Sequence, residues 1–356
     1  MLKKIVLIGL VGLIFVAFLK REQLISLFGS DVSRTVNTSQ TRILLDEDPT
    51  FEVLLDKLEQ EGVIDDVEAI KSIVEEEDID ISDLAGGKYL IFSGTKLTDL
   101  IEGFQKGENG QGKSELNVNV IFNTCRDVYD LGGNVSKCIV ADSTSIVNYI
   151  LDPKTLAKYG FTFEQISALF LPKKYQMPYD TDAEGFVAFM AGKFKEFWNK
   201  ERRAKMKALG LSSQSKVTTL ASIVYSEQGR VKKEWPIIAA LYLNRLSRGQ
   251  KLQSDPTFKF CWGHELDGVQ RLMKKHREII CDYNTYNIVG LPPGPICITP
   301  ASVVDAVLNA ADVDYVYMCA KPDYSGKHNF TASDRQHINN ANMYQKWLSA
   351  ELKKKK

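Results

Sequence analysis

The sequence has few of the residues on which many enzyme classes depend. Only four histidines occur among 356 residues, and no His-Glu-x-x-His pattern is present, so a zinc-protease type of metal site is not indicated. A Gly-x-Ser-x-Gly elbow, which would present a serine nucleophile, is also absent. We therefore expect no metal and no cofactor, and the sequence favours chemistry carried by carboxylates.

The chain has no excess of either charge. Lys and Arg together number 45, as do Asp and Glu, so the formal net charge is zero. No block of the main body is basic enough to follow a phosphate backbone, and nucleic acid is not an expected partner. The four lysines at residues 353–356 are expected to form a solvated tail.

One apolar run is long enough to concern a membrane. It covers residues 5–19 and has two basic residues on each side. At 1.5 Å per residue it spans about 22 Å against about 30 Å of hydrocarbon, which is short but workable with snorkelling lysines. No small-x-small cleavage site follows it, which favours an uncleaved signal anchor over a cleaved signal peptide. The equal basic flanks leave the orientation open.

The six cysteines form an even set, which an oxidising compartment would allow to pair. Two disulfides are the first candidates: Cys125 with Cys138, and Cys261 with Cys281. A zinc site that combines the second pair with His264 and His276 is an alternative, because ligand spacings of two and four residues are plausible. Disulfides or buried thiols are the simpler interpretation.

Hydrophobic periodicity predicts an α+β chain. Residues 51–73 carry two short helical stripes separated at Gly62. Residues 87–94 alternate like a strand and lead into a helical stripe over residues 97–104. After a glycine-rich loop, residues 118–122 alternate again, which completes a small α+β module.

The rest of the chain is predicted to be mostly helical. Residues 143–211 show helical spacing, and residues 236–248 form a further helix that ends at Gly249. Near the C-terminus, residues 315–320 and 327–330 predict a hairpin.

The most informative helix is predicted over residues 215–228. Leu220, Ile223 and Val224 line one apolar face, and Glu227 closes that face in the last turn. Burial and the negative end of the helix dipole both disfavour the anion, so the pKa of Glu227 should be raised, as suits a general acid. From the pattern alone, a structural carboxylate that reaches water or pairs with a base such as Arg245 is the simpler interpretation.

A polar loop follows at residues 251–257. Its Gln253, Ser254 and Asp255 can hydrogen-bond sugar hydroxyls and amides. By itself, Ser-Asp-Pro is an ordinary turn.

A second loop is predicted to be stiff. Asn284, Tyr286 and Asn287 lie just before the proline-rich stretch 290–295, which suits neither a helix nor a sheet interior. Such a loop can form the wall of a sugar groove, although a rigid connector is the simpler explanation.

Six segments in order resemble the endolytic murein transglycosylase family over about 140 residues. Each motif is weak by itself, whereas the six in this order are specific. They are Leu-Ala-Ser-Ile-Val-Tyr-Ser-Glu (220–227), Ala-Leu-Tyr-Leu-Asn-Arg (240–245), Leu-Gln-Ser-Asp-Pro-Thr (252–257), Tyr-Asn-Thr-Tyr (283–286), Gly-Leu-Pro-Pro-Gly-Pro-Ile (290–296) and Gly-Lys-His-Asn-Phe (326–330). Upstream, residues 87–91 and 100–104 resemble that family's LysM-like module.

The resemblance implies a single-pass protein of the bacterial inner membrane with a periplasmic catalytic domain. That domain would cleave the MurNAc–GlcNAc linkage within nascent peptidoglycan strands, limit their length, and work with the peptidoglycan synthases, the penicillin-binding proteins. Family members often carry two glutamates in the stretch equivalent to residues 225–227. Here the first position is Tyr225, which leaves Glu227 as the acid.

The implied site and mechanism follow from this match. Glu227 would protonate the glycosidic oxygen and then, as a carboxylate, deprotonate the C6 hydroxyl of the same MurNAc, giving a 1,6-anhydro end. The expected groove residues are Gln253, Ser254, Asp255, Asn284, Tyr286 and Asn287. Two other functions stay open: a lysozyme-like hydrolase with Asp255 or another carboxylate as base, and a catalytically silent peptidoglycan-binding scaffold.

The expected organisation has six parts. They are a signal anchor (1–21), a linker (22–42), a LysM-like α+β module (43–142), a helical connecting region (143–211), a catalytic domain (212–352) and the lysine tail (353–356).

Overall fold

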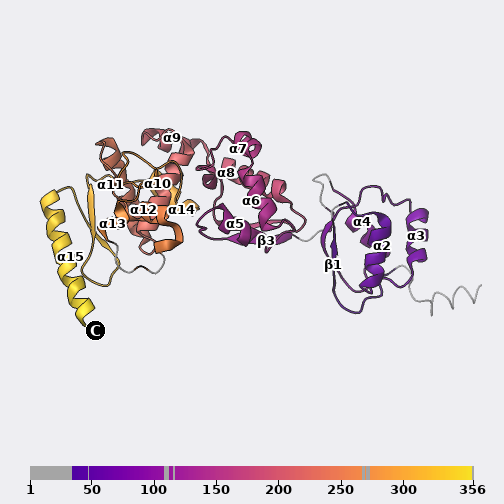
Figure 1. Ribbon diagram of the computed structural model, residues 1–356. Coiled ribbons are helices and arrows are strands. Elements are labelled where there is room, and N and C mark those ends of the chain that lie inside the picture. The colour runs from indigo at the N-terminus through magenta and orange to yellow at the C-terminus, as the bar shows by residue number, and fades with distance from the viewer. Residues whose placement is uncertain are drawn as a thin grey trace, which may run out of the picture. The chain divides into compact units, whose positions relative to one another are not determined.

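The protein has a mixed α+β fold, as the sequence predicts. The computed structural model describes residues 34–354, except 47, 108–111, 115–116, 267–268 and 270–272. Figure 1 traces this chain, whose contacts separate it into two compact units. The first unit holds the described residues up to Asn117 together with Pro178–Asp180, and the second holds Val118–Met177 and the chain from Thr181.

The predicted anchor over residues 1–21 lies outside the described residues. Within the part of the chain that the structure does describe, no helix is both long enough and apolar enough to cross a membrane. The predicted linker, residues 22–42, extends too far along the chain, because folded structure begins before residue 42. The backbone N–H of Thr35 donates to Thr95 O and that of Val36 donates to Val63 O, each at 2.9 Å, so residues from 34 onward already belong to the first unit.

The first unit is a small α+β module with its own core. Two antiparallel strands pair Ile43 with Tyr89, which are both almost fully buried, and the amphipathic helices cover the same face. Thr50 and Asp66 accept backbone N–H groups at the starts of the first two helices, which explains where these helices begin. The elements are β1 Thr41–Leu45, α2 Phe51–Gln60, α3 Val67–Glu76, β2 Gly87–Ile91 and α4 Leu97–Phe104.

The boundary of this module differs from the prediction of residue 142. The alternating stretch 118–122 does form a strand, β3 Asn117–Phe122, but it pairs with β4 Lys173–Pro178. Its inward residue Phe122 stacks on Tyr175 at 5.9 Å between ring centroids and joins a core of the second unit. Residues 118–142 therefore belong with the helical region that follows them.

The second unit contains two buried clusters. The first gathers side chains from the elements up to α8, and the second surrounds α10. The helices before the site are α5 Val128–Val135, α6 Ser143–Leu151, α7 Pro153–Tyr159, η1 Ile166–Leu169, α8 Ala183–Phe197 and α9 Lys200–Ala208.

The second cluster belongs to the region that carries the predicted motifs. The helix and hairpin predictions for this region are confirmed, whereas the long C-terminal helix, which packs on the hairpin, had no prediction. The elements are α10 Gln214–Glu227, η2 Lys232–Glu234, α11 Trp235–Ser247, α12 Asp255–Trp262, η3 Gly263–Leu266, α13 Lys274–Arg277, α14 Ala301–Leu308, β5 Tyr317–Ala320, β6 His328–Thr331 and α15 Asp334–Lys354.

The proline-rich loop at residues 290–295 has no regular secondary structure, as predicted, and it touches another backbone directly. A Cβ atom added at the buried Gly294 would lie 1.8 Å from the carbonyl oxygen of Glu164. Only glycine fits this contact, because backbone cannot move aside as the end of a flexible side chain can.

We therefore expect Gly294→Ala to lower the free energy of unfolding by about 1–3 kcal/mol, the usual cost of overpacking. Urea unfolding monitored by tryptophan fluorescence would measure it. The matched control is Gly192→Ala within α8, where an added Cβ meets nothing within 4 Å and alanine favours the helix. Equal stability of the two variants would contradict the proposed contact.

Candidate active site

Helix α10 is the central element of the candidate site. Ser213 caps its start by accepting the N–H of Lys216, and every residue from Val217 to Val224 is buried. The helix is thus covered on all sides, where the sequence predicted one apolar face. Its polar residues fit there because their hydroxyls donate back to the helix: Thr219 to Ser215 O, and Ser222 to Thr219 O.

Glu227 is the last residue of this helix, and it is only partly exposed. Its Oε1 accepts two hydrogen bonds, from the Tyr242 hydroxyl at 2.7 Å and from the Ser254 hydroxyl at 2.5 Å. Among the described residues, none donates a hydrogen bond to Oε2. The carboxyl therefore has one oxygen fixed by the protein and one available to a ligand.

Burial raises the pKa of Glu227 above its ordinary value, although the hydroxyls of Ser254 and Tyr242 oppose the shift. The nearby Asp255 charge raises this pKa further, and His328 lowers it. The net direction agrees with the expectation from the sequence, and it keeps a proton on the carboxyl at a higher pH than usual.

Arg245 does not pair with Glu227, so the structural interpretation that the sequence favoured is wrong in this respect. The Arg245 guanidinium is directed to Val316 O at 2.8 Å and to the side chain of Gln253 at 2.7 Å. No other basic side chain bonds to Glu227 among the described residues.

Ser254 and Asp255 lie at the start of α12, and not in a free turn as their Ser-Asp-Pro sequence suggested. The Ser254 hydroxyl does not cap this helix but donates to Glu227. Asp255 accepts from the Tyr286 hydroxyl at 2.5 Å with one oxygen and from Arg277 at 3.2 Å with the other. Both groups predicted at this loop therefore lie at the candidate site.

Gln253 joins the two predicted loops. Its backbone N–H donates to Thr285 O at 3.1 Å, and its φ of 55° lies in the left-handed region that non-glycine residues seldom adopt. The bond from Arg245 holds its side chain. The conformation places Ser254, the next residue, against the Glu227 carboxyl.

The predicted groove residues of the second loop fall into two groups, one at the surface and one buried beneath it. Tyr286 is partly exposed and bonds to Asp255, and Asn287 is exposed. Asn284, in contrast, is fully buried, and its amide donates to the carbonyls of Arg277 and Ile279. The assignment of Asn284 to the groove surface is therefore wrong, because its hydrogen-bonding capacity is used to shape the loop.

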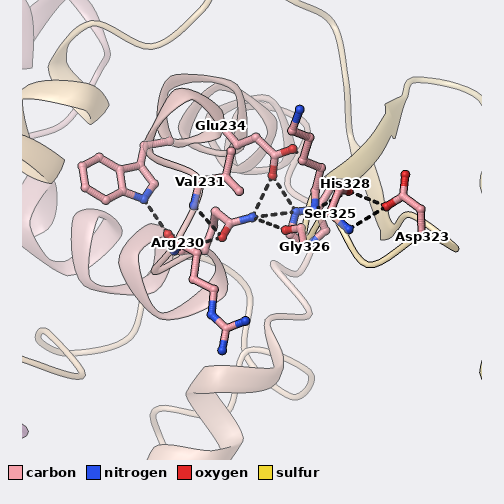
Figure 2. Close-up of polar contacts among 10 residues, drawn as sticks. Arg230, Val231, Glu234, Asp323, Ser325, Gly326 and His328 are labelled. Atoms are coloured by element: carbon pink, nitrogen blue, oxygen red, sulfur yellow. Dashed lines mark hydrogen bonds and ion pairs between the residues drawn. The ribbon is translucent and has the colours of Figure 1, made fainter.

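Sequence reasoning missed Tyr242, Gln228 and Glu234. Tyr242 lies within the helix predicted over residues 236–248, at helical spacing from Ile238, and its hydroxyl reaches Glu227 only in the folded protein. Gln228 and Glu234 meet His328 of β6 in a polar cluster beside the end of α10, and Figure 2 shows Glu234 next to His328. The signal available in the sequence was the match of the segment around His328 to a family motif.

These positions can be compared with known proteins. The sequence profile of the YceG-like family matches residues 43–343. The chain belongs to the YceG-like family. This confirms the family resemblance that the six ordered segments indicated.

Individual relatives of this YceG-like chain agree with the assignment. An endolytic murein transglycosylase of Bacillus subtilis is 36% identical over 125 residues, which are 35% of this chain and 33% of that protein. One of Streptococcus pneumoniae is 21% identical over 262 residues, which are 67% of this chain and 47% of that protein. The chain thus spans between a third and a half of these curated relatives.

The fold also has a solved counterpart. The crystal structure of a YceG-like protein from Listeria monocytogenes matches with a TM-score of 0.51 and 20% identity, covering 85% of this chain and 99% of that one. This likeness supports the fold of the YceG-like chain.

The YceG-like chain contains one of the two predicted disulfides. Cys261 and Cys281 are bonded and join α12 to the loop of Tyr286. The pairing of Cys125 with Cys138 is wrong, because both are free thiols, with Cys125 buried and Cys138 partly exposed. The zinc alternative is wrong, because Cys261 and Cys281 are bonded to each other. No group of side chains suited to a metal ion occurs in the residues that the structure covers.

One glycine-rich segment has the sequence spacing of a phosphate-binding loop, but its described flanks differ from those of such a loop. Residues 107–114 read Gly-Glu-Asn-Gly-Gln-Gly-Lys-Ser, which has the spacing of a P-loop. Such a loop leads from a strand into a helix, whereas this segment follows α4 and precedes β3. The described flanks therefore lack the strand-to-helix arrangement that a P-loop has.

Replacing both Cys261 and Cys281 by Ser should lower the free energy of unfolding by about 3 kcal/mol, since the bond closes a 20-residue loop. Urea unfolding with and without a reductant would measure it. The reductant should destabilise the wild type but not the double variant, and Cys138→Ser, at a free thiol, should behave as wild type. A wild type insensitive to reduction would argue against the bond.

Glu227→Gln should make the protein more stable at neutral pH. The raised pKa means that Glu227 ionises at a lower pH in the unfolded chain than in the folded protein, so the free energy of unfolding of the wild type falls as the pH rises from the unfolded pKa to the folded pKa. The gain of the variant should vanish near pH 4, below the unfolded pKa of about 4.3, and grow by about 1.4 kcal/mol for each unit between the two pKa values. Urea unfolding from pH 4 to 8 tests this. A gain that is the same at every pH would contradict the raised pKa.

Proposed function

We propose that this chain is an endolytic murein transglycosylase that cleaves the MurNAc–GlcNAc bond within peptidoglycan strands. The observation that carries the proposal is the Glu227 carboxyl, which ends a buried helix, has a raised pKa, and is held at one oxygen by two hydroxyl groups. The membership of the YceG-like family and the names of the two curated relatives support the same activity.

The mechanism uses Glu227 twice. With Oε1 accepting from Tyr242 and Ser254, the acidic proton is carried on Oε2 and passes to the glycosidic oxygen as the C1–O bond breaks. The carboxylate then takes the proton of the C6 hydroxyl of the same MurNAc. The oxygen of that hydroxyl forms the new bond to C1. The products are a 1,6-anhydro-MurNAc end and a GlcNAc end, and Glu227 regains its proton.

The surroundings of Asp255 favour this route over hydrolysis. A hydrolase of the inverting type needs a second carboxylate that is free to activate water. Both oxygens of Asp255 already accept hydrogen bonds, from Tyr286 and Arg277. In the transglycosylase, Asp255 instead orients Tyr286.

The groove wall is proposed to consist of Gln253, Asp255, Tyr286 and Asn287, whereas the predicted groove residue Ser254 is fully buried and acts as a donor to Glu227. The partly exposed Tyr286 is proposed to contact a sugar, and the Arg277 guanidinium lies over its ring, 5.2 Å from the centroid. Gln253 and Asn287 are exposed and carry amides that suit sugar hydroxyls.

We further propose that residues 1–21 anchor the protein in the membrane and that the catalytic region works outside the cytoplasm. The Cys261–Cys281 disulfide supports this placement, since such bonds persist in oxidising compartments. The first unit, with its separate core, is proposed to be a LysM-like module that holds glycan strands, and the peptidoglycan synthases are the proposed partners.

Digestion of purified glycan strands tests the activity. The wild-type protein should release fragments that are one water lighter than hydrolysis products, and Glu227→Gln should reduce the rate by at least about 10²-fold. The matched control is Glu201→Gln, an exposed carboxylate on α9. Fragments of hydrolytic mass would support the lysozyme-like alternative, and undiminished digestion by Glu227→Gln would refute the role of Glu227. Binding to sacculi without any digestion would support the scaffold.

A further inference from the structure

Gln228, the residue that follows Glu227, makes hydrogen bonds through both ends of its side-chain amide and through its backbone carbonyl. Gln228 is the C-cap residue of α10, and its side-chain Oε1 accepts the N–H groups of Arg230 at 3.1 Å and Val231 at 3.0 Å. Its Nε2 donates to Glu234 at 2.9 Å and to Gly326 O at 2.8 Å. The backbone takes part as well, since Gln228 O accepts from the indole of Trp235. Gln228 is buried, so water does not satisfy these groups.

Glu234 is the centre of this arrangement. Its side chain is 9% exposed, and it accepts three N–H groups. One comes from Gln228, and two come from His328, the backbone N–H at 2.9 Å and the ring Nδ1 at 2.8 Å. Burial raises the pKa of Glu234, but the hydrogen bonds from His328 and Gln228 outweigh it and lower the pKa overall. Glu234 is thus an anion, and Nδ1 of His328 carries the hydrogen that it accepts.

The three residues join elements that are distant in the sequence. Gln228 caps the end of α10, Glu234 ends η2, and His328 begins β6. Figure 2 shows His328 close to Ser325, Gly326 and Glu234. His328 also acts on Glu227, because its electrostatic interaction with that carboxyl lowers the Glu227 pKa. The cluster therefore lies at the end of the helix that carries the acid.

We propose that Gln228, Glu234 and His328 form a positioning network that fixes the end of α10 and so aims the Glu227 carboxyl at the glycosidic oxygen. The proposal rests on the function proposed above. None of the three residues exchanges a proton with the substrate. Glu234 orients Gln228 and His328 by accepting from both, and Gln228 transmits that order to the adjacent Glu227.

The geometry of Glu227 explains why such a network matters. Its Oε1 must stay within reach of both the Tyr242 and the Ser254 hydroxyls while Oε2 faces the substrate. A displacement of about 1 Å at a reacting group can cost about 10²-fold in rate. The last residue of a helix is also where fraying begins, unless its neighbours are bonded as Gln228 is.

The first test is Glu234→Gln. The amide has one accepting oxygen for three N–H donors, and its own NH₂ would face a donor, so the network must open. We expect kcat for glycan cleavage to fall by about 10- to 100-fold while KM stays within about twofold, because the substrate groove is not altered. The matched control is again Glu201→Gln. A wild-type kcat in Glu234→Gln would overturn the proposal.

The second test separates positioning from proton transfer at His328. The amide nitrogen of asparagine can replace Nδ1 as donor to Glu234, but it cannot act as an acid or base near neutral pH. We expect His328→Asn to keep kcat within about threefold of wild type and His328→Ala to lose about 10-fold or more. If His328→Asn is as slow as His328→Ala, the imidazole itself takes part in the chemistry and the positioning role is refuted.

The pH profile gives a readout that a general loss of stability would not move. The basic limb of kcat reports loss of the Glu227 proton, and the groups that act on it are Ser254 and Tyr242 as donors, with Asp255 and His328 as charges. If the end of α10 loosens in Glu234→Gln, Glu227 becomes better solvated and the limb should move to lower pH. A lower kcat with an unmoved limb would mean only destabilisation and would contradict the network.

The two proposals fail in different ways. If Glu227→Gln digests strands as well as wild type, the proposed function is wrong. If Glu227→Gln is inactive but Glu234→Gln is not impaired, the function stands and the positioning network is wrong.

Discussion

The placement of one carboxyl group at the end of a buried helix is the constraint on which the rest of the site depends. Removing Glu227 from water raises its pKa, and the same burial would be costly if its oxygen lacked partners. The hydroxyls of Tyr242 and Ser254 meet that need at Oε1 alone. The other oxygen is left for a ligand, so the requirement of folding and the requirement of the proposed acid catalysis are met by the same two donors.

The loops around this carboxyl are shaped from behind. The Asn284 amide holds the carbonyls of its own loop, and the left-handed Gln253 is fixed by Thr285 O and Arg245. The Cys261–Cys281 bond joins α12 to the same loop. These contacts bring Asp255 and Tyr286 together at the surface, so the proposed groove wall is rigid because its support is buried.

The sequence predicted the elements that local patterns determine. Periodicity indicated α10, α11 and the β5–β6 hairpin, and helical spacing placed Glu227 in a last turn. It could not place Tyr242, because an aromatic residue at helical spacing indicates a core position and says nothing about where the hydroxyl points. Likewise, an asparagine in a polar loop gives no sign that it is fully buried. The cysteine spacing allowed two pairs, and only the tertiary fold decides that Cys125 faces the interior.

Helix α10 has no face turned to solvent along most of its length, so the packing of the core affects the position of the helix end. A surface helix can absorb a poorly packed neighbour by tilting slightly towards water, whereas α10 packs against α11, α12, α14 and η1 and is buried from Val217 to Val224. A misfit deep in the core would therefore be passed along the helix axis to its end. Under the proposed function, the aim of the Glu227 carboxyl would then depend also on apolar residues that never meet the substrate.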